Sequence, residues 1–501
     1  MCLDTTLVER RVDDYRNASP LFVSRNRSRP KWGTCALLAV LCGASFAHAQ
    51  DEQRRIERIL RPTDERALGG SLSLSLTERT PIDVGGYLSL VGLHLTDAND
   101  NAHRLFQPEV GLYARATIDN THSFFVRSRF QYRDFGEGDS FDGEGDGWSE
   151  PFVDRFWYEI DMTRAFAADT VDPNHSLRVR IGRQFIDWGA GLALSENLYA
   201  IRPVMTLDRW TFDAVAGITP SDESVVDFDT SRNQFNTNTR RGFFGGRVAY
   251  RTPSNHEFYG YYLRMQDYND DLQHARATAI PGKFDFEYNG NYFGVGARGS
   301  FSTSLLYLAE FVYETGESQA DPLRSVQRAE DISAYAARAQ LTYLLRDKNR
   351  SRVEGELLLA SGDDDRLVST DTIGGNLRGS NDTGFNSLGY VNTGLAFSPA
   401  LSNLVAVRVG GSTFPLTDVN GLDRLQIGAD LLVSFKLDSD APIDEATDPE
   451  SYLGTELDFS LNYAVTSDLS LTARYGVFFG GDAITAADTR HFVFVGLTLS
   501  F

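Results

Sequence analysis

The sequence has little cysteine: it holds three in 501 residues, and Cys2, Cys35 and Cys42 all lie before residue 43. If that stretch is removed as a leader, the mature chain has no cysteine at all. This excludes disulfides, thiolate metal sites and cysteine nucleophiles.

Residues 1–49 are expected to be a cleavable signal peptide. An apolar run, 35–42, precedes Ala47-His48-Ala49, a small-x-small pattern that predicts cleavage before Gln50. The run is too short to cross a bilayer as a helix, and bulky Leu41 does not suit a lipoprotein signal at Cys42. Residues 1–24 suggest a start codon assigned too early or an unstructured tail. The basic residues before the run are Arg25, Arg27, Arg29 and Lys31.

The rest of the chain lacks a stretch of ~20 apolar residues and an excess of basic charge. The leader holds seven of the 48 Lys/Arg and four of the 69 Asp/Glu, which leaves 41 and 65 and a formal charge of −24. A chain this acidic will not bind nucleic acid through a general basic surface. Helical periodicity is confined to a short piece, 51–60.

Alternation of apolar and polar residues is what the chain does contain. Segments of roughly ten alternating residues recur between turn residues, most clearly at 457–465, 469–479 and 491–501. A soluble β-sandwich rarely combines such alternation with a signal peptide, 12% aromatic residues and a C-terminal Phe501. The pattern predicts an all-β protein of a Gram-negative outer membrane, a transmembrane antiparallel up-and-down β-barrel in contact with lipid. Phe501 would be read by the barrel-insertion machinery.

We expect about eighteen strands between residues 81 and 501, because single-chain bacterial barrels have even strand numbers. Barrels of 16–18 strands leave an aqueous channel. Residues 50–80 are expected to form an N-terminal periplasmic segment, in which 71–76 alternate either as an extra pairing or as a loose tail. Segment 198–204 is a doubtful strand. The strands are expected near 82–96, 106–118, 122–134, 152–162, 175–186, 198–204, 207–218, 241–252, 256–267, 290–301, 303–315, 332–345, 351–361, 385–397, 402–414, 423–436, 453–465, 468–479 and 489–501.

If the apolar parity faces lipid, the other parity lines the lumen. This rule places inside Arg115, Arg127, Arg129, Arg133, Arg178, Arg180, Arg241, Arg247, Arg251, Arg338, Arg408, Arg424 and Arg474, and the acids Glu159, Asp161, Asp213, Glu310, Glu354, Glu356, Asp430, Glu456 and Asp458. Arg155 and Trp157 are also inward, and a Trp face can stack against a pyranose ring. Most of these charges are expected to brace the wall. The segments 106–134, 175–186 and 241–252 contribute nine arginines without matching acids, which predicts a role in anion transport.

Several short motifs resemble those of alginate-export outer-membrane proteins. They lie in order at 155–157, 177–184, 210–217, 360–365, 453–458 and 474–483. The resemblance implies an eighteen-stranded barrel with an Arg-lined constriction for a polyuronate. It carries over Arg155, Arg183 and Arg474, with Glu456 and Asp458 as acidic counterweights.

The sequence departs from the family pattern at two places. Gly481 stands where Pro is common, and Trp188-Gly189 stands where polar residues are usual. Arg183 falls on the lipid parity unless Gly182 introduces a bulge.

Chemistry other than transport has little support in the sequence. None of the mature chain's histidines lies in a patterned motif with Ser or a carboxylate, so a hydrolase is the least expected function and no cofactor is expected. Asp142, Glu144 and Asp146 match the first half of a calcium loop, but Val153 stands at its twelfth position, which favours a solvated acidic loop. We therefore expect a channel for an anionic polysaccharide, alginate or a related polyuronate, or its oligomers, working with periplasmic export partners. A porin for small anions or uronates is the alternative.

Overall fold

The computed structural model describes most of the chain beyond residue 78. The described ranges are 79–136, 146–166, 174–220, 241–268, 287–320, 328–366, 376–445, 447–485 and 489–501.

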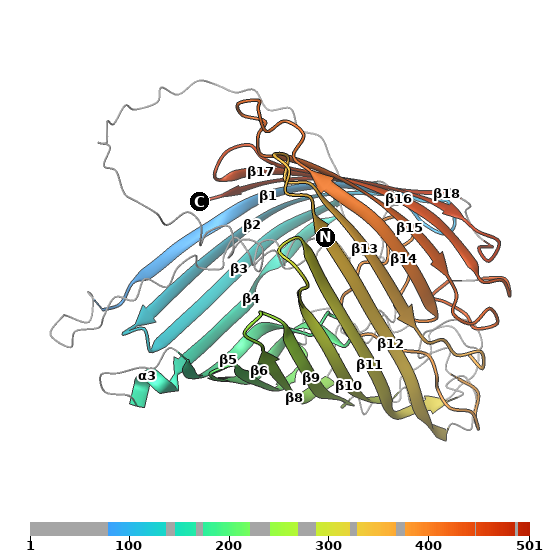
Figure 1. The fold of residues 1–501 in the computed structure, drawn as a ribbon, viewed down its shortest axis with the longest axis horizontal. Helices are drawn as coiled ribbons and strands as arrows, with labels where there is room; N and C mark the ends of the chain where they lie inside the picture. The colour runs from blue at the N-terminus through green and yellow to red at the C-terminus, as the bar shows by residue number, and fades with distance from the viewer. Residues whose placement is uncertain are drawn as a thin grey trace.

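These residues form one closed sheet of eighteen antiparallel strands, the number expected from the alternation. Each strand pairs with its neighbours in the sequence, and β1 pairs with β18 from Tyr87↔Ser500 to Leu95↔Phe492. The barrel therefore has no free edge (Figure 1). The strands are β1 Ile82–Thr96, β2 Ala102–Ile118, β3 His122–Phe135, β4 Gly147–Asp161, β5 His175–Trp188, β6 Leu194–Leu207, β7 Trp210–Ile218, β8 Arg241–Arg251, β9 Glu257–Asp267, β10 Tyr288–Ser300, β11 Leu305–Ala320, β12 Arg328–Leu344, β13 Arg352–Ala360, β14 Leu404–Thr413, β15 Leu425–Phe435, β16 Tyr452–Ala464, β17 Leu469–Gly480 and β18 Thr489–Ser500.

Two of the expected segments differ from the structure. The doubtful segment 198–204 belongs to a full strand, β6, which pairs with β5 along its whole length. The segment 385–397 is not a strand, because β13 pairs directly with β14, from Arg352↔Ser412 to Ala360↔Leu404. Its backbone amides bind carboxylates of the barrel wall instead, and Gly394 turns the chain with φ +142.

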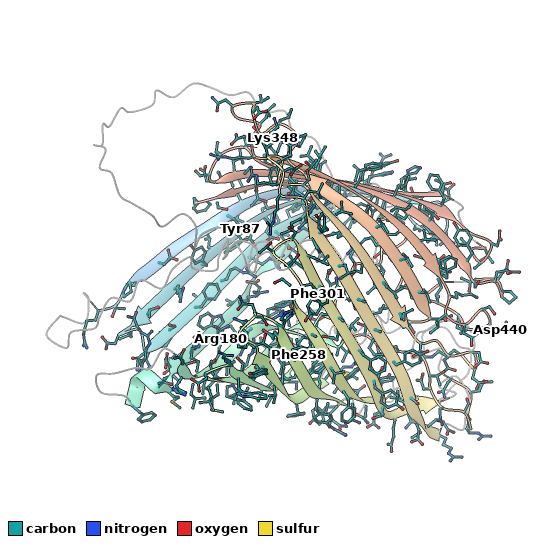
Figure 2. All side chains as sticks on the ribbon, in the orientation of Figure 1. Tyr87, Arg180, Phe258, Phe301, Lys348 and Asp440 are labelled. Carbon is teal, nitrogen blue, oxygen red and sulfur yellow. The ribbon has the colours of Figure 1, made fainter. Side chains whose placement is uncertain are left out.

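The connections differ in length at the two ends of the barrel. Short turns join β2 to β3 and β6 to β7, and Asp119 and Asn120 both adopt the positive φ that a tight hairpin requires. Lys348, in the short turn from β12 to β13, and Asp440, between β15 and β16, lie at opposite ends of the strands (Figure 2). Outer-membrane barrels have their short turns on the periplasmic side, so we assign that end to the periplasm.

The two faces of each strand differ in polarity. On β12, Tyr335, Leu341 and Tyr343 are exposed on one face, while Arg338 and Gln340 are buried on the other. Exposed apolar side chains recur at alternate positions around the closed sheet, so this face meets lipid and the charged face lines the lumen.

The chain end and the short α3, Met162–Phe166, complete the described fold. Phe501 and Gly86 exchange two backbone hydrogen bonds, of 2.8 and 2.9 Å, beside the β1–β18 seam. Among the described residues, no helix has the length and apolarity needed to span a membrane. The N-terminal segment 50–78 and the leader lie outside the described residues.

Candidate functional site

Two inward arginines of β3, Arg127 and Arg129, are paired with acids. Arg127 Nε lies 2.9 and 3.0 Å from the two carboxylate oxygens of Asp154, and its Nη2 donates to the same group. Asp154 reaches the lumen because β4 bulges there: Arg155 pairs with Arg127, but Val153 pairs with Ser128. Arg129 binds Glu109 at 2.8 Å. The expectation that these arginines lack matching acids is therefore wrong.

Trp157 contacts an aromatic ring and a guanidinium group. Phe125 is stacked on one side at 5.4 Å between ring centroids, and the Arg180 guanidinium carbon lies 4.1 Å from the ring centroid. Arg180 also binds Glu159 at 2.8 Å. Between an anionic and an aromatic neighbour, the guanidinium is held in one place. Trp157 therefore contacts Arg180, which Figure 2 labels.

Inward arginines gather at the periplasmic ends of neighbouring strands, in a group that we call the basic belt. Arg202 binds Asp213 at 2.6 Å, and Glu257 accepts from three arginines, on β8 and β10. Asp161, opposite Arg178 in the register, pairs with Arg164. The belt thus has six arginines against the three carboxylates of Glu159, Asp213 and Glu257. Its arginines are Arg178, Arg180, Arg202, Arg247, Arg251 and Arg298.

Three expected site arginines lie away from this belt. Arg155 is buried, with its guanidinium 5.3 Å from the Phe185 ring. Arg183 lies opposite Phe156 and Tyr199 in the register. Gly182 has φ +130, but the register continues through it, so it introduces no bulge that would turn Arg183 inward. It is 1% exposed within the wall, where it donates to the Val153 carbonyl. Arg115 lies opposite Asp83 on β1.

The connection from β5 to β6, residues 189–193, crosses the lumen; we call it the first lumen segment. Its Ala190 amide donates to Glu310 on β11 at 2.6 Å, and its Ala190 carbonyl accepts from Arg338 on β12 at 2.7 Å. Gly189 has φ +64, and a Cβ there would lie 1.9 Å from the Glu310 carboxylate, so only glycine fits. The preceding Trp188 donates to Asp213 at 3.1 Å. The Trp188-Gly189 departure from the family pattern therefore has a structural role.

A second lumen segment, residues 385–403, occupies the place where a strand was expected. Its Asn386 amide donates to Glu314 at 2.9 Å, and its carbonyl accepts from Tyr292 at 2.9 Å. Residues of both lumen segments pack with inward side chains in one apolar cluster, in which Leu192 and Leu388 are fully buried. The core of the molecule therefore lies inside the barrel.

The acids expected to balance Arg155, Arg183 and Arg474 have other partners. Glu456 accepts three backbone N–H groups of the second lumen segment. Asp458 lies opposite Asp430 and Gly476 in the register. Arg474 donates to Asn462 at 3.0 Å and to two backbone carbonyls.

Two clusters of acidic residues have the carboxylates that a bound metal cation would need. Asp142 and Glu144 lie outside the described residues, and the Asp146 carboxylate accepts from the Phe135 amide at 2.8 Å, which closes the hairpin. Asp363, Asp364 and Asp365 have oxygens within 4.8 Å of one another. Arg366 lies 3.5 Å from Asp363 and also binds Asp382 at 2.7 Å, so it supplies one positive charge beside this group.

Among the charged wall residues that sequence reasoning missed, five are belt residues or partners of Arg127 and Arg129. Strict alternation along β2, β6, β9 and β10 would have found four of them: Glu109, Arg202, Glu257 and Arg298. Asp154 sits on the bulge and breaks the alternation, so no sequence signal could place it.

Comparison with known proteins agrees with this geometry. The sequence model of a family described as alginate export matches residues 115–496. The solved Pseudomonas aeruginosa porin OccK5 (OpdH) has a TM-score of 0.51 and 10% identity, covering 85% of this chain and 100% of that one. For OccK11 (OpdR) of the same organism these values are 0.48, 12%, 83% and 96%. Among curated proteins none matches the sequence. The fold is that of an outer-membrane barrel, and the chain belongs to the alginate export family.

Proposed function

We propose that this outer-membrane channel passes an anionic polysaccharide, alginate or a related polyuronate, or its oligomers. The observation that carries the proposal is the basic belt, whose arginines outnumber their carboxylates by three. A solute that crosses the lumen passes this arc of charge, which covers the wall from β5 to β10. In a narrow lumen with low-dielectric walls, such a cluster concentrates anions.

Acids elsewhere in the lumen lie on other strands than the belt arginines and make local contacts of their own. Glu310, Glu314 and Glu456 accept backbone amides of the lumen segments. Glu356 is bound by Arg338 and Arg408. The positive excess is therefore local to the belt, where a passing anion would meet it.

A second candidate is a porin for small uronates or other small anions. The two lumen segments favour it, since backbone and side chains fill part of the barrel interior. Both candidates use the same arginines, and they differ in the length of the solute.

Current block by uronate oligomers tests the proposal. In planar bilayers, oligomers added on the short-turn side are expected to interrupt the single-channel current, whereas neutral oligosaccharides of equal length leave it unchanged. Raising the salt from 0.1 to 1 M shortens the screening length from ~10 to ~3 Å and should weaken the block. Equal block by neutral oligomers would contradict the proposal, and block by monomers alone would favour the small-anion porin.

The partners follow from the same proposal. An exporter receives its polymer at the periplasmic mouth, where the basic belt lies, so a periplasmic export protein would meet the short turns there. The insertion machinery would read the last strand, β18, with Phe501 at its end.

A further inference from the structure

Each of the two lumen segments is attached to strands other than the two that it connects. The first begins after β5 but is fixed to β11 and β12, six and seven strands further round the sheet. The second begins after β13 and is fixed to β10, β11 and β16. Contacts between strands so far apart in a closed sheet can only run through the lumen.

The two segments also bind each other. The Ser387 hydroxyl donates to the Leu192 carbonyl at 2.7 Å, and the Ser195 amide donates to the Leu388 carbonyl at 3.1 Å. We call the pair the lumen clasp. Because it is joined in the middle and anchored at the wall, it forms one internal partition.

Glu456 is the main anchor of the clasp on the C-terminal wall. Its carboxylate accepts the amides of Leu395, Ala396 and Phe397 at 2.5, 2.7 and 3.0 Å, and it is 3% exposed. Hydrogen bonds to a charged, buried acceptor are the strong ones.

An aromatic stack holds the same point of the clasp from the neighbouring strand, where Phe478 lies opposite Glu456 in the register. Phe397 is stacked on Phe478 of β17 at 4.3 Å with an interplanar angle of 7°. The Arg490 guanidinium lies 5.4 Å from the Phe397 ring and binds both oxygens of Glu445 at 2.7 Å. The segment is therefore fixed by its backbone and by a side chain.

We propose that the lumen clasp sets the largest solute that the channel passes, and that Glu456 is the positioning residue that keeps the clasp in place. The inference rests on the proposed channel function and adds a size limit to it. The limit acts on neutral and charged solutes alike, since it comes from the space that the clasp fills.

The test compares Glu456→Gln with Glu354→Gln. Gln keeps the shape of the side chain but loses the charge and one acceptor oxygen, so the three amides lose their common anchor. Glu354 is a matched control, because it is a buried inward glutamate on β13 without a hydrogen bond to the clasp in the described structure. Thr393→Cys is the reporter, since Thr393 lies in the clasp and is 5% exposed. Cys35 and Cys42 are replaced by alanine in all variants, and Cys2 by serine.

The rate at which a thiol reagent labels the reporter cysteine is expected to rise roughly tenfold with Glu456→Gln, because a weakened anchor raises the fraction of channels whose second lumen segment is detached from the wall. With Glu354→Gln the labelling rate should stay unchanged. Proteoliposomes with Glu456→Gln should also swell in neutral oligosaccharides that the parent channel excludes. Electrophoresis without heating shows whether each barrel is folded. If Glu456→Gln does not fold, residues 387–396 are replaced by a Gly-Ser chain of equal length, which should raise the size limit.

Unchanged labelling and an unchanged size limit in a folded Glu456→Gln barrel would overturn the role of Glu456. An unchanged limit after the Gly-Ser replacement would overturn the whole inference. Ion selectivity is measured separately on the same barrels. If the size limit does not change but the channel prefers anions, the inference about the clasp is wrong and the proposed function is retained. If the parent channel does not prefer anions, the result counts against the proposed function alone.

Discussion

Replacing Arg178, Arg251 and Arg298 by glutamate is expected to change the channel from anion-preferring to cation-preferring. The triple change turns three excess positive charges of the basic belt into three excess negative ones. It leaves the pairs of Arg180, Arg202 and Arg247 with Glu159, Asp213 and Glu257 in place. The anion-to-cation permeability ratio, from reversal potentials in a salt gradient, should fall below one, by on the order of tenfold.

The control makes the same charge change outside the lumen. Arg346, Lys348 and Arg350 are exposed in the turn between β12 and β13, and their replacement by glutamate should leave the permeability ratio unchanged. Arg127 and Arg129 are unsuitable for such a test, because both form buried ion pairs. An equal shift from both triple variants would mean that total charge, and not the belt, sets the selectivity.

Asp154→Ala is expected to destabilise the barrel by about 3–5 kcal/mol, because removing one partner leaves a buried charge without its counterion. Both side chains of the Arg127–Asp154 pair are almost fully buried, at 2% and 1% exposure. The measurement is the urea concentration at which half of the barrel in lipid is unfolded. The folded fraction is read from the faster electrophoretic migration of the folded barrel in unheated samples. Arg127→Met with Asp154→Leu should recover part of the loss, since neither charge then remains.

Asp418→Ala is the matched control for that variant. It removes the carboxylate of an ion pair with Lys348 whose side chains are 76% and 69% exposed. Solvent screens such a pair, so the urea midpoint should not move. If the urea midpoint falls equally in both variants, the buried Arg127–Asp154 pair does not stabilise the barrel more than the exposed Lys348–Asp418 pair.

The barrel itself was predictable from the sequence, because a lipid-facing strand has to alternate. Tyr335, Leu341 and Tyr343 against Arg338 and Gln340 show this on one strand. The same rule predicted the inward parity of Arg127 and of four of the six belt arginines. It marked nineteen segments, one of which, 385–397, is not a strand, and the rule of even strand numbers reduced them to the eighteen of the structure.

What the sequence could not give are contacts made across the lumen. Residues 385–397 alternate like a strand, but their amides bind Glu314 and Glu456, which are far away in the sequence. The Asp154 bulge shifts the parity by one residue without leaving a mark in the composition. Which acid each arginine binds depends on such shifts of the backbone. The sequence alone therefore could not distinguish arginines that brace the wall in ion pairs from arginines that face a solute.

The ion selectivity of the unmodified channel tests the central claim most directly. The mature chain is expected to carry a charge of −24, and by total charge alone it would be a cation channel. The basic belt predicts the opposite, because every permeating ion passes it, whereas charges in the loops are screened within ~8 Å at physiological salt. In a salt gradient across a planar bilayer, the reversal potential should therefore have the sign of anion preference. A reversal potential with the sign of cation preference would contradict the account of an arginine-selected anionic substrate.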